Sequence, residues 1–364
     1  MTVVERVEAS VYVFPTDAPE GDGTFAWDST TMTLVRVWSG GATGIGWTYG
    51  AADCGAVIRS TLAPLVTGTD PMDVPGTWEK MVRAVRNSGR QGAIGYAISA
   101  VDAALWDLKA RLLDVPLSGL LGRVRTEVPV YASGGFTTYD DAQLAEQLGG
   151  WLAAGATRVK VKIGESWGSQ ESRDLARMTR ARELIGDDVE LFVDANGGYS
   201  AKQAIRVMDQ ARDLDIRWFE EPVSSDRIDQ LAEVRAIVAP DVAAGEYGYD
   251  LFTFRRLCES GAVDVLQADV SRCGGLTEWM RVAAVAASFG LELSGHCAPN
   301  LHVHVAAGIP NLRHLEWFHD HDRIERRMFD GALIPRDGVV MLTDAPGNGL
   351  TMREADVAKF LVSA

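Results

Sequence analysis

Charged and polar side chains recur at the ends of short apolar segments in the second half of the chain, where buried parallel strands should read as nearly continuous apolar runs. Taken singly, a carboxylate there is usually a helix N-cap, a histidine a satisfied core group and a lysine pair a solvated edge. Charges are almost never buried without partners, so their recurrence on six successive segments and again on the last one favours a functional site. The residues concerned are Lys160, Lys162, Asp194, Asn196, Glu220, Glu221, Glu246, Asp269, His296 and Glu316.

Removal of a proton next to a carboxylate is the chemistry that this set of residues suits. Such a C–H is very weakly acidic, and its loss places a second negative charge on the carboxylate oxygens, so a cation and hydrogen-bond donors must be preorganised there. Asp194, one member of the Glu220–Glu221 pair and Glu246 offer hard oxygen ligands, which suit Mg²⁺. A positioned Lys or His then serves as the base.

Eight short apolar segments, separated by helix-length stretches, must position these side chains. Because parallel neighbours need a crossover of a dozen or more residues, a spacing of about one βα unit predicts a parallel (β/α)₈-type barrel with the polar residues at its carboxyl end. An open doubly wound sheet is the alternative, but no G-x-G-x-x-G pattern opens a helix here. The segments begin at Val128, Arg158, Glu190, Arg217, Val242, Val263, Leu291 and His314.

The order of strands around such a ring assigns the residues to the walls of one site. The third, fourth and fifth strands are neighbours, so the three ligand carboxylates can meet. The second strand lies opposite the sixth, so Lys162 and an Asp269–His296 pair would flank the metal from two sides. The eighth strand lies opposite the fourth, so Glu316 would meet the far edge of the bound group, and it could donate a hydrogen bond if protonated.

The N-terminal part has a different pattern. Residues 4–14, 30–40 and 43–50 alternate like strands of an antiparallel meander, and the Pro-, Gly- and Asp-rich residues 15–29 between the first two predict a loop. From about Gly76 the pattern is helical, with one apolar stripe before Pro116 formed by Ile98, Val101, Leu105, Leu108 and Leu112. We therefore predict an N-terminal α+β domain over 1–125, a barrel over 126–325, and a segment over 326–364 that packs back on the first domain.

Composition limits the partners. The 35 Lys and Arg against 50 Asp and Glu give a net charge of −15 without a basic cluster, so non-specific binding to nucleic acid or to an anionic membrane has no electrostatic basis. No stretch reaches the roughly 20 apolar residues of a membrane span. The four cysteines lie far apart with no C-x-x-C spacing, which is typical of reduced thiols. We expect a soluble cytoplasmic protein.

In order and spacing, these motifs resemble the mandelate racemase subgroup of the enolase superfamily over essentially the whole chain. The matching elements are SAVDAALWDLKARLLDVPLSGLLG, Lys160-Val161-Lys162, FVDANG, WFEEP, AAGEYG, LQADVSRCGG, LSGHCAP and HLEWF. The resemblance implies a modified TIM barrel, (β/α)₇β, under an N-terminal α+β capping domain whose loops select the substrate, here residues 15–31 and 44–53. It also implies a small carboxylate substrate and a homo-oligomer, although no sequence feature fixes the number of subunits.

The resemblance further implies a role for each proton-transfer group. Lys162 is the base on one face of the substrate, with Lys160 near the substrate carboxylate, and Asp269 with His296 forms a dyad on the opposite face. A Lys or His base with Mg²⁺ is the known pattern of enolase-superfamily sites. The muconate-lactonizing subgroup has a Lys in the position of Asp269, so that subgroup is disfavoured.

The remaining implied roles concern the metal and the substrate carboxylate. Asp194, Glu220 and Glu246 are the implied ligands of one Mg²⁺ per subunit; strand parity leaves Glu220 and Glu221 equivalent, and the resemblance selects Glu220. Asn196 lies beside the metal, and Glu316 is the carboxylic acid that hydrogen-bonds the substrate carboxylate.

The reaction is open between two outcomes of one enediolate intermediate. Loss of a β-hydroxyl, with His296 as general acid, is dehydration, which we rank first because many similar members are acid-sugar dehydratases. Reprotonation from the other face is racemisation or epimerisation of a 2-hydroxy acid or an amino-acid derivative. A non-catalytic ligand-binding barrel is a third hypothesis, but it predicts that a metal or proton-transfer position has been replaced, and none has.

Neither candidate specificity segment contains Lys, Arg or His. A second, distal carboxylate would therefore lack a cation there, although other loops could supply one. We accordingly expect a hydroxylated monocarboxylic (sugar) acid, whose identity the sequence does not fix.

Two further features have ordinary explanations. Cys297 has no separate base, so a small buried apolar role is expected. Five histidines form a loose run whose spacing matches no zinc pattern, so helix or loop surface is the default expectation for His302, His304, His314, His319 and His321.

Overall fold

A closed barrel of eight parallel strands forms the larger part of the computed structural model, which describes residues 2–364. The strands pair in chain order, and the eighth pairs with the first to close the ring. They are β4 (Glu127–Gly134), β5 (Arg158–Lys162), β6 (Glu190–Asp194), β7 (Ile216–Glu220), β8 (Asp241–Ala244), β9 (Val265–Ala268), β10 (Glu292–Gly295) and β11 (Leu312–Phe318). The predicted parallel barrel is thus confirmed, with each strand near its expected position.

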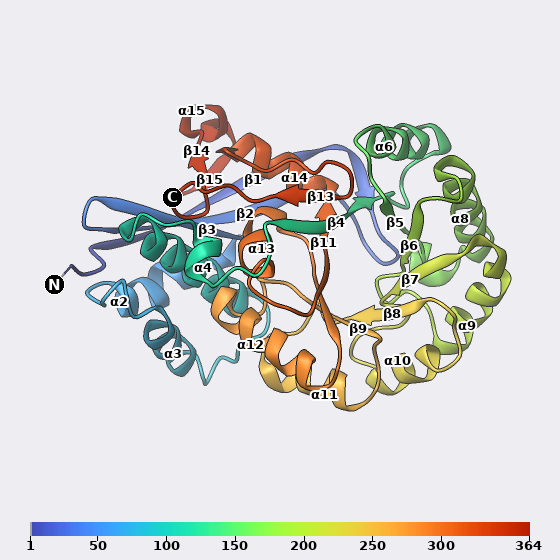
Figure 1. The fold of residues 1–364 in the computed structure, drawn as a ribbon, viewed down its shortest axis with the longest axis horizontal. Coiled ribbons are helices and arrows are strands. Elements are labelled where there is room, and N and C mark those ends of the chain that lie inside the picture. The colour runs from blue at the N-terminus through green and yellow to red at the C-terminus, as the bar shows by residue number, and fades with distance from the viewer. Residues whose placement is uncertain (1) are drawn as a thin grey trace.

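Helices follow the strands and cover the outside of the ring (Figure 1). Seven of them separate consecutive strands: α6 (Asp141–Ala153), α8 (Glu171–Ile185), α9 (Ala201–Gln210), α10 (Ile228–Arg235), α11 (Leu251–Glu259), α12 (Gly275–Ser288) and α13 (Pro299–Ala306). The helix after the last strand, α14 (His319–Met328), packs against α13 and against β12 (Phe329–Asp330) and α15 (Glu354–Val357) of the C-terminal segment. Seven regular βα units and a final strand therefore describe the barrel, as expected for (β/α)₇β.

An antiparallel sheet with helices forms the N-terminal domain. Its strands β1 (Arg6–Gly21), β2 (Ala26–Ser39) and β3 (Ala42–Tyr49) form a meander, and the long helix α4 (Ala93–Leu112) packs along β3 and β2. Gly44 and Gly46 allow this approach, since a Cβ on either would lie within 2.2–2.4 Å of backbone oxygens of α4. The smaller helical elements are α1 (Asp53–Val57), the π-helical turn at Ile58–Leu62, α2 (Ala63–Val66), α3 (Val74–Ala84) and α5 (Leu117–Leu120).

The loop predicted for residues 15–29 is wrong in most of its length. Both strands continue through it, with a register shift between Pro15 and Glu20, so only residues 22–25 form the turn. The Asp22 carboxylate accepts the backbone N–H groups of Thr24 and Phe25 and thereby closes this turn. Pro15 is tolerated because the bulge next to it interrupts the ladder. The result is a long hairpin that extends from the N-terminal sheet across the carboxyl end of the barrel (Figure 1).

Backbone contacts hold the hairpin tip on the barrel. Thr137, after β4, donates its backbone N–H to the Gly21 carbonyl and its hydroxyl to the Asp22 carbonyl, at 2.8 and 2.7 Å. Trp167 donates its backbone N–H to the Gly23 carbonyl at 2.8 Å. A Cβ on Gly23 would lie 2.5 Å from the Ala195 carbonyl oxygen, so glycine permits this docking. The hairpin is therefore a fixed wall above the strand ends.

The C-terminal segment contacts both parts of the molecule. Strand β15 (Leu361–Ser363) pairs with β1, whereas β13 (Val339–Met341) pairs antiparallel with β4 of the barrel. The remaining short elements are α7 (Glu165–Gly168), β14 (Thr351–Met352) and the 3₁₀ turns Arg212–Leu214 and Ala358–Phe360. The domain limits at 125/126 and 325/326 stay a prediction, and Met1 lies outside the described residues. Within residues 2–364, no helix is both long and apolar enough to cross a membrane.

Candidate active site

The predicted site residues gather at the carboxyl ends of β5 to β11. Parallel register places Lys162, Asp194 and Glu220 side by side on three neighbouring strands. The eight charged residues are all buried, and Asn196 is half-buried above Asp194, to whose carboxylate its backbone N–H donates at 2.9 Å. Their catalytic and metal-binding roles stay predictions. The charged group comprises Lys160, Lys162, Asp194, Glu220, Glu246, Asp269, His296 and Glu316.

Lys160 lies at the centre of the carboxylates. Its Nζ is 3.2 Å from Asp194 Oδ2 and 2.7 Å from Glu316 Oε1, and it also donates to Glu220. Burial disfavours the charged amine, but attraction to Glu220 and Glu316 outweighs burial and raises the pKa of Lys160 well above its ordinary value. Lys160 is thus a fixed positive charge at the base of the site.

Lys162 points along the same face and donates to Asp194. Burial opposes its charge, yet Asp194 raises the pKa of Lys162 above its ordinary value. Burial likewise opposes ionisation of Asp194, but the two lysines lower the pKa of this carboxyl to about 2. The Asp194 carboxylate is therefore held by the two ammonium groups.

Unpaired oxygens lie beside this ion-pair network. Both oxygens of Glu220 are bonded, one to Lys160 and one to the Trp218 indole N–H at 2.8 Å. In contrast, Glu246 Oε2, Glu221 Oε1 and Asn196 Oδ1 are buried without a hydrogen-bond donor. Burial and the neighbouring Glu246 raise the pKa of Glu221 well above its usual range.

These acceptors fit a divalent cation. Glu220, Glu246 and His296 each place one ligand atom within 4.8 Å of the others. Burial and the nearby Asp194 raise the pKa of Glu220 to about 8. Clustered carboxylate oxygens with unfilled acceptor positions are the donor set that Mg²⁺ prefers.

The dyad is built on the next two strands. His296 Nδ1 lies 2.8 Å from Asp269 Oδ2, and Ser271 donates its backbone N–H and hydroxyl to Asp269 Oδ1, each at 2.7 Å. Burial opposes ionisation of Asp269, but His296 and Arg272 outweigh it and lower its pKa. The ionised carboxylate holds the His296 Nδ1–H and leaves Nε2 for the site, 3.2 Å from Glu246 Oε2 in a geometry that makes no hydrogen bond.

Glu316 is held as a carboxylate by groups on three sides. It accepts the Ser133 hydroxyl at 2.6 Å and the Cys297 backbone N–H at 3.0 Å, besides its ion pair with Lys160. Burial raises the pKa of Glu316, but Lys160 and His296 together lower it well below its usual range. The groups around Glu316 thus favour its ionised form, and its role toward the substrate carboxylate stays a prediction. Cys297 is buried as expected, but its N–H gives it a polar role as well.

A cavity of about 630 Å³ opens over these residues and beneath the hairpin. Its floor includes Lys162, Glu246 and His296, and its walls include hydroxyl and aromatic side chains from both predicted specificity segments. Those wall residues are Phe25, Trp27, Ser29, Thr30, Thr31 and Tyr49. The volume lies in the range of small-molecule sites.

The sequence patterns do not single out Arg272, which lies three residues after Asp269 and lines the cavity. Its Nε is 3.2 Å from Asp269 Oδ2 and its Nη1 is 3.1 Å from Glu246 Oε1. It bridges the dyad and the carboxylate cluster. Ser133, which donates to Glu316, was detectable in principle, because it is a polar residue one position before the end of the first barrel strand.

The surface location expected for the histidine run is wrong for four of its members, which are at most 6% exposed: His302, His304, His314 and His321. Three of them use at least one ring nitrogen in a hydrogen bond, whereas His304 Nδ1 and His314 Nε2 are buried without a partner. His302, for example, accepts the Val270 N–H at 2.9 Å and lies 2.8 Å from the Cys297 carbonyl. A neutral imidazole carries one donor and one acceptor, so burying it with such partners costs little free energy.

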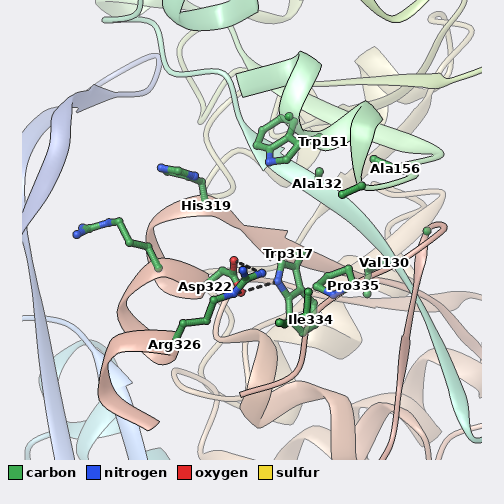
Figure 2. Close-up of a pocket in the computed structure, with 14 residues that line it drawn as sticks. Val130, Ala132, Trp151, Ala156, Trp317, His319, Asp322, Arg326, Ile334 and Pro335 are labelled. Atoms are coloured by element: carbon green, nitrogen blue, oxygen red, sulfur yellow. Dashed lines mark hydrogen bonds and ion pairs between the residues drawn. The ribbon is translucent and has the colours of Figure 1, made fainter. Parts of the chain in front are cut away.

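A second cavity, of about 520 Å³, lies outside the barrel between α6 and α14 (Figure 2). Trp151 and Trp317 stand on facing sides of it, and Asp322 is paired there with Arg326 at 2.8 Å and with the Trp317 indole N–H at 2.8 Å. None of the predicted site residues lines this cavity. The cavity under the hairpin is therefore the one that the predicted site residues line.

Comparison with known proteins agrees with this arrangement. The model of the mandelate racemase/muconate lactonizing enzyme N-terminal domain matches residues 13–122, and that of the enolase C-terminal domain-like family matches residues 143–356. A mandelate racemase/muconate lactonizing enzyme-like protein from Rubrobacter xylanophilus is 47% identical, with a TM-score of 0.96 over 99% of this chain and 100% of that one.

Two relatives with named activities are also similar over most of the chain. The 3,6-anhydro-alpha-L-galactonate cycloisomerase of Streptomyces coelicolor is 32% identical over 96% of this chain and 97% of its own. The L-talarate/galactarate dehydratase of Salmonella typhimurium is 31% identical over 86% of this chain and 78% of its own. A crystal structure of that dehydratase with Mg and L-lyxarohydroxamate superposes with a TM-score of 0.90, at 28% identity over 99% of this chain and 93% of that one. The chain therefore belongs to the mandelate racemase/muconate lactonizing enzyme family of the enolase superfamily.

Proposed function

We propose that this protein is a Mg²⁺-dependent enzyme that removes the proton α to the carboxylate of a hydroxylated monocarboxylic acid and then expels the β-hydroxyl as water. The observation that carries the proposal is the placement of two independent proton-transfer groups, Lys162 and the Asp269–His296 dyad, around one buried carboxylate cluster. Such a pair allows one group to take the α-proton and the other to act on the opposite face.

Asp194, Glu220 and Glu246 would hold the cation. When bound, Mg²⁺ supplies positive charge for the enediolate and, beside Asp194, favours the neutral amine of Lys162. Lys160 remains charged and orients the substrate carboxylate. Similarity to a dehydratase whose structure holds Mg supports this assignment.

His296 is suited to the acid role. Burial lowers its pKa, but Glu246 and Glu316 outweigh burial, and the net shift is upward. An imidazolium whose Nδ1–H is held by Asp269 can release the Nε2 proton to a leaving hydroxyl. The bond that breaks is the Cβ–O bond; the proton from His296 leaves in the water, and the enediolate electrons form the new double bond of an enol, which becomes the 2-keto-3-deoxy acid.

The charges of the cavity favour a monocarboxylate. Its lysine and arginine side chains are already paired, Lys162 with Asp194 and Arg272 with Glu246 and Asp269. Arg272 is thus a cation from a loop outside the two specificity segments, but its carboxylate partners leave little charge for a distal carboxylate. Hydroxyl groups along the hairpin suit substrate hydroxyls instead.

Exchange of the substrate α-hydrogen tests the proposal. With Mg²⁺ in D₂O, a panel of sugar acids and hydroxy acids should show deuterium incorporation and 2-keto acid formation for at least one member, and both Lys162→Ala and His296→Asn should lose turnover. Formation of an epimer without keto acid would replace dehydration by racemisation, and formation of an isomeric open-chain or lactone product would indicate cycloisomerisation. Absence of exchange across the panel would count against catalysis.

A further inference from the structure

The loop that follows His296 adopts a strained backbone. Cys297 and Ala298 both have positive φ values, 53° and 38°, which L-residues with a Cβ rarely adopt. Such conformations persist where surrounding contacts determine them. Here the Cys297 N–H donates to Glu316 Oε2 at 3.0 Å, and the Ala298 N–H donates to Nδ1 of His321 at 3.1 Å.

The contact from Ala298 fixes the tautomer of His321. A backbone N–H is always a donor, so Nδ1 of His321 must be the unprotonated nitrogen and the neutral ring carries its hydrogen on Nε2. Burial, together with the nearby cations, lowers the pKa of His321 well below its ordinary value, so the ring stays neutral. His321 lines the substrate cavity, and within residues 2–364 its Nε2 has no hydrogen-bond acceptor.

The ring is also clamped in orientation. The Tyr49 ring stacks on it with centroids 3.4 Å apart and planes 10° apart, and the Phe318 ring meets it edge-on at 5.1 Å. The Tyr49 hydroxyl donates to Glu325 at 3.1 Å, and that carboxylate is fixed by three more donors, the Trp47 indole N–H and the two N–H groups of Asn300. The cap thereby holds His321 in place through Tyr49.

We propose that His321 is a specificity-determining residue whose Nε2–H donates a hydrogen bond to a hydroxyl oxygen of the bound acid. The His321 Nε2–H is a neutral donor, held in a fixed orientation beside the loop that follows His296. Because it carries no charge, it favours a hydroxyl oxygen of the ligand over a second carboxylate. This inference rests on the proposed function in requiring a hydroxylated acid as ligand. The tautomer and orientation of His321 do not depend on that function.

The first test needs no substrate. In ¹⁵N-histidine-labelled protein, with His321 assigned by its loss in His321→Gln, the side-chain nitrogens should show the Nε2–H neutral tautomer between pH 6 and 8. A protonated Nδ1 or a charged ring would overturn the proposal.

The second test separates hydrogen bonding from structure. His321→Phe keeps an aromatic ring against Tyr49 but removes the donor, whereas His321→Gln retains one. Against the acid found by the exchange screen, His321→Phe should lower kcat/KM by about 10- to 1000-fold and His321→Gln by less than about 10-fold. Against the analogue that lacks the recognised hydroxyl, His321→Phe and wild type should be equal. Equal losses on every deoxy analogue would overturn the proposal, because they would indicate a structural role only. His319→Gln, two residues away with its ring directed to Asp17, is the matched control and should stay within twofold.

If no acid is turned over, the proposed function fails, and the His321 proposal is then tested by ligand binding alone. Gluconate or arabinonate added with Mg²⁺ should then still shift the His321 Nε2–H resonance while leaving that of His319 unchanged. Failure of both acids to move the His321 signal would overturn the inference as well. A folded state for each variant is checked by circular dichroism.

Discussion

Arg272 and His296 contact the same oxygen, Oδ2 of Asp269: the guanidinium Nε forms an ion pair with it at 3.2 Å, and His296 Nδ1 hydrogen-bonds it at 2.8 Å. Ser271 donates two hydrogen bonds to the other oxygen of Asp269, and Arg272 extends from Asp269 to Glu246. One guanidinium therefore links the dyad to the carboxylate cluster. It can contact two carboxylates at once because its N–H groups form a rigid fork.

Loss of that fork should weaken catalysis without unfolding the protein. We expect Arg272→Leu to lower kcat about 10- to 100-fold, because Asp269 and Glu246 lose the cation that pairs with both, and Arg272→Lys to recover only part of the loss, since an ammonium lacks the fork. Rates of α-hydrogen exchange measure the effect. Full activity in Arg272→Leu would show that Ser271 alone orients the dyad.

Removal of single carboxylates should distinguish the two adjacent glutamates. Glu220→Gln should lower Mg²⁺ affinity by at least 10-fold, measured by calorimetry, because it removes a charged ligand. Glu221→Gln is the matched control and should retain Mg²⁺ dependence. The reverse order would move the ligand assignment to Glu221, whose free oxygen already lies buried near Glu246.

Metal binding should also stabilise the fold. Because the cation binds the native carboxylates and not the unfolded chain, Mg²⁺ at 100 times its Kd should add about 2.7 kcal/mol to the free energy of unfolding. Thermal unfolding with Mg²⁺ and with a chelator measures the difference. An unchanged Tm at saturating Mg²⁺ would argue against a native cation site.

Displacement of the hairpin tip should impair substrate binding more than folding. In Gly23→Ala the new Cβ meets backbone oxygens of Ala195 and Ile163 at 2.5 and 2.8 Å, neither of which can move freely, so the tip must lift. We expect a several-fold increase in KM and faster proteolysis within residues 15–29. Gly149→Ala in α6, where the Cβ meets nothing within 4 Å, is the control and should be neutral or stabilising by about 0.5–1 kcal/mol. Equal KM values for both variants would contradict a docked tip.

Asp102, buried in α4, predicts a dependence of stability on pH. It accepts the backbone N–H and hydroxyl of Thr277, yet burial raises its pKa from 3.8 to about 7. The folded state then binds a proton that the unfolded state has lost, so the free energy of unfolding falls as pH rises towards 7, by roughly 3 kcal/mol between pH 5 and pH 8.

An asparagine mimics the protonated form at that position. Asp102→Asn should therefore gain stability relative to wild type by a similar amount over the same pH interval, measured by urea unfolding. A difference between the two proteins that does not change with pH would mean that Asp102 is ionised throughout.

The repeating parts of this molecule are predictable from sequence because they follow local rules. Buried parallel strands need apolar runs and crossovers, so the eight strands could be placed, and polar residues at their ends converge because a closed ring brings them together. The hairpin could not be predicted in the same way: its Pro, Gly and Asp residues suggest a loop, and only docking onto Thr137 and Trp167 makes an extended conformation favourable. The burial of His321 could not be predicted either. It depends on Tyr49, which is distant in the sequence, and on Ala298, which lies in a loop without a periodic pattern.

The Glu325 carboxylate has a consequence for how the chain matures. Its donors come from Trp47 and Tyr49 near one end and from Asn300 near the other, all of them buried. During synthesis the first pair leaves the ribosome nearly 280 residues before Glu325 does. Until then, the indole N–H and the phenol lack this carboxylate, so the wall that presents Tyr49 to the cavity is completed only after the last barrel strand. The contact that fixes Tyr49 beside the cavity is thus formed late in synthesis, and a chain that ended before Glu325 would lack it.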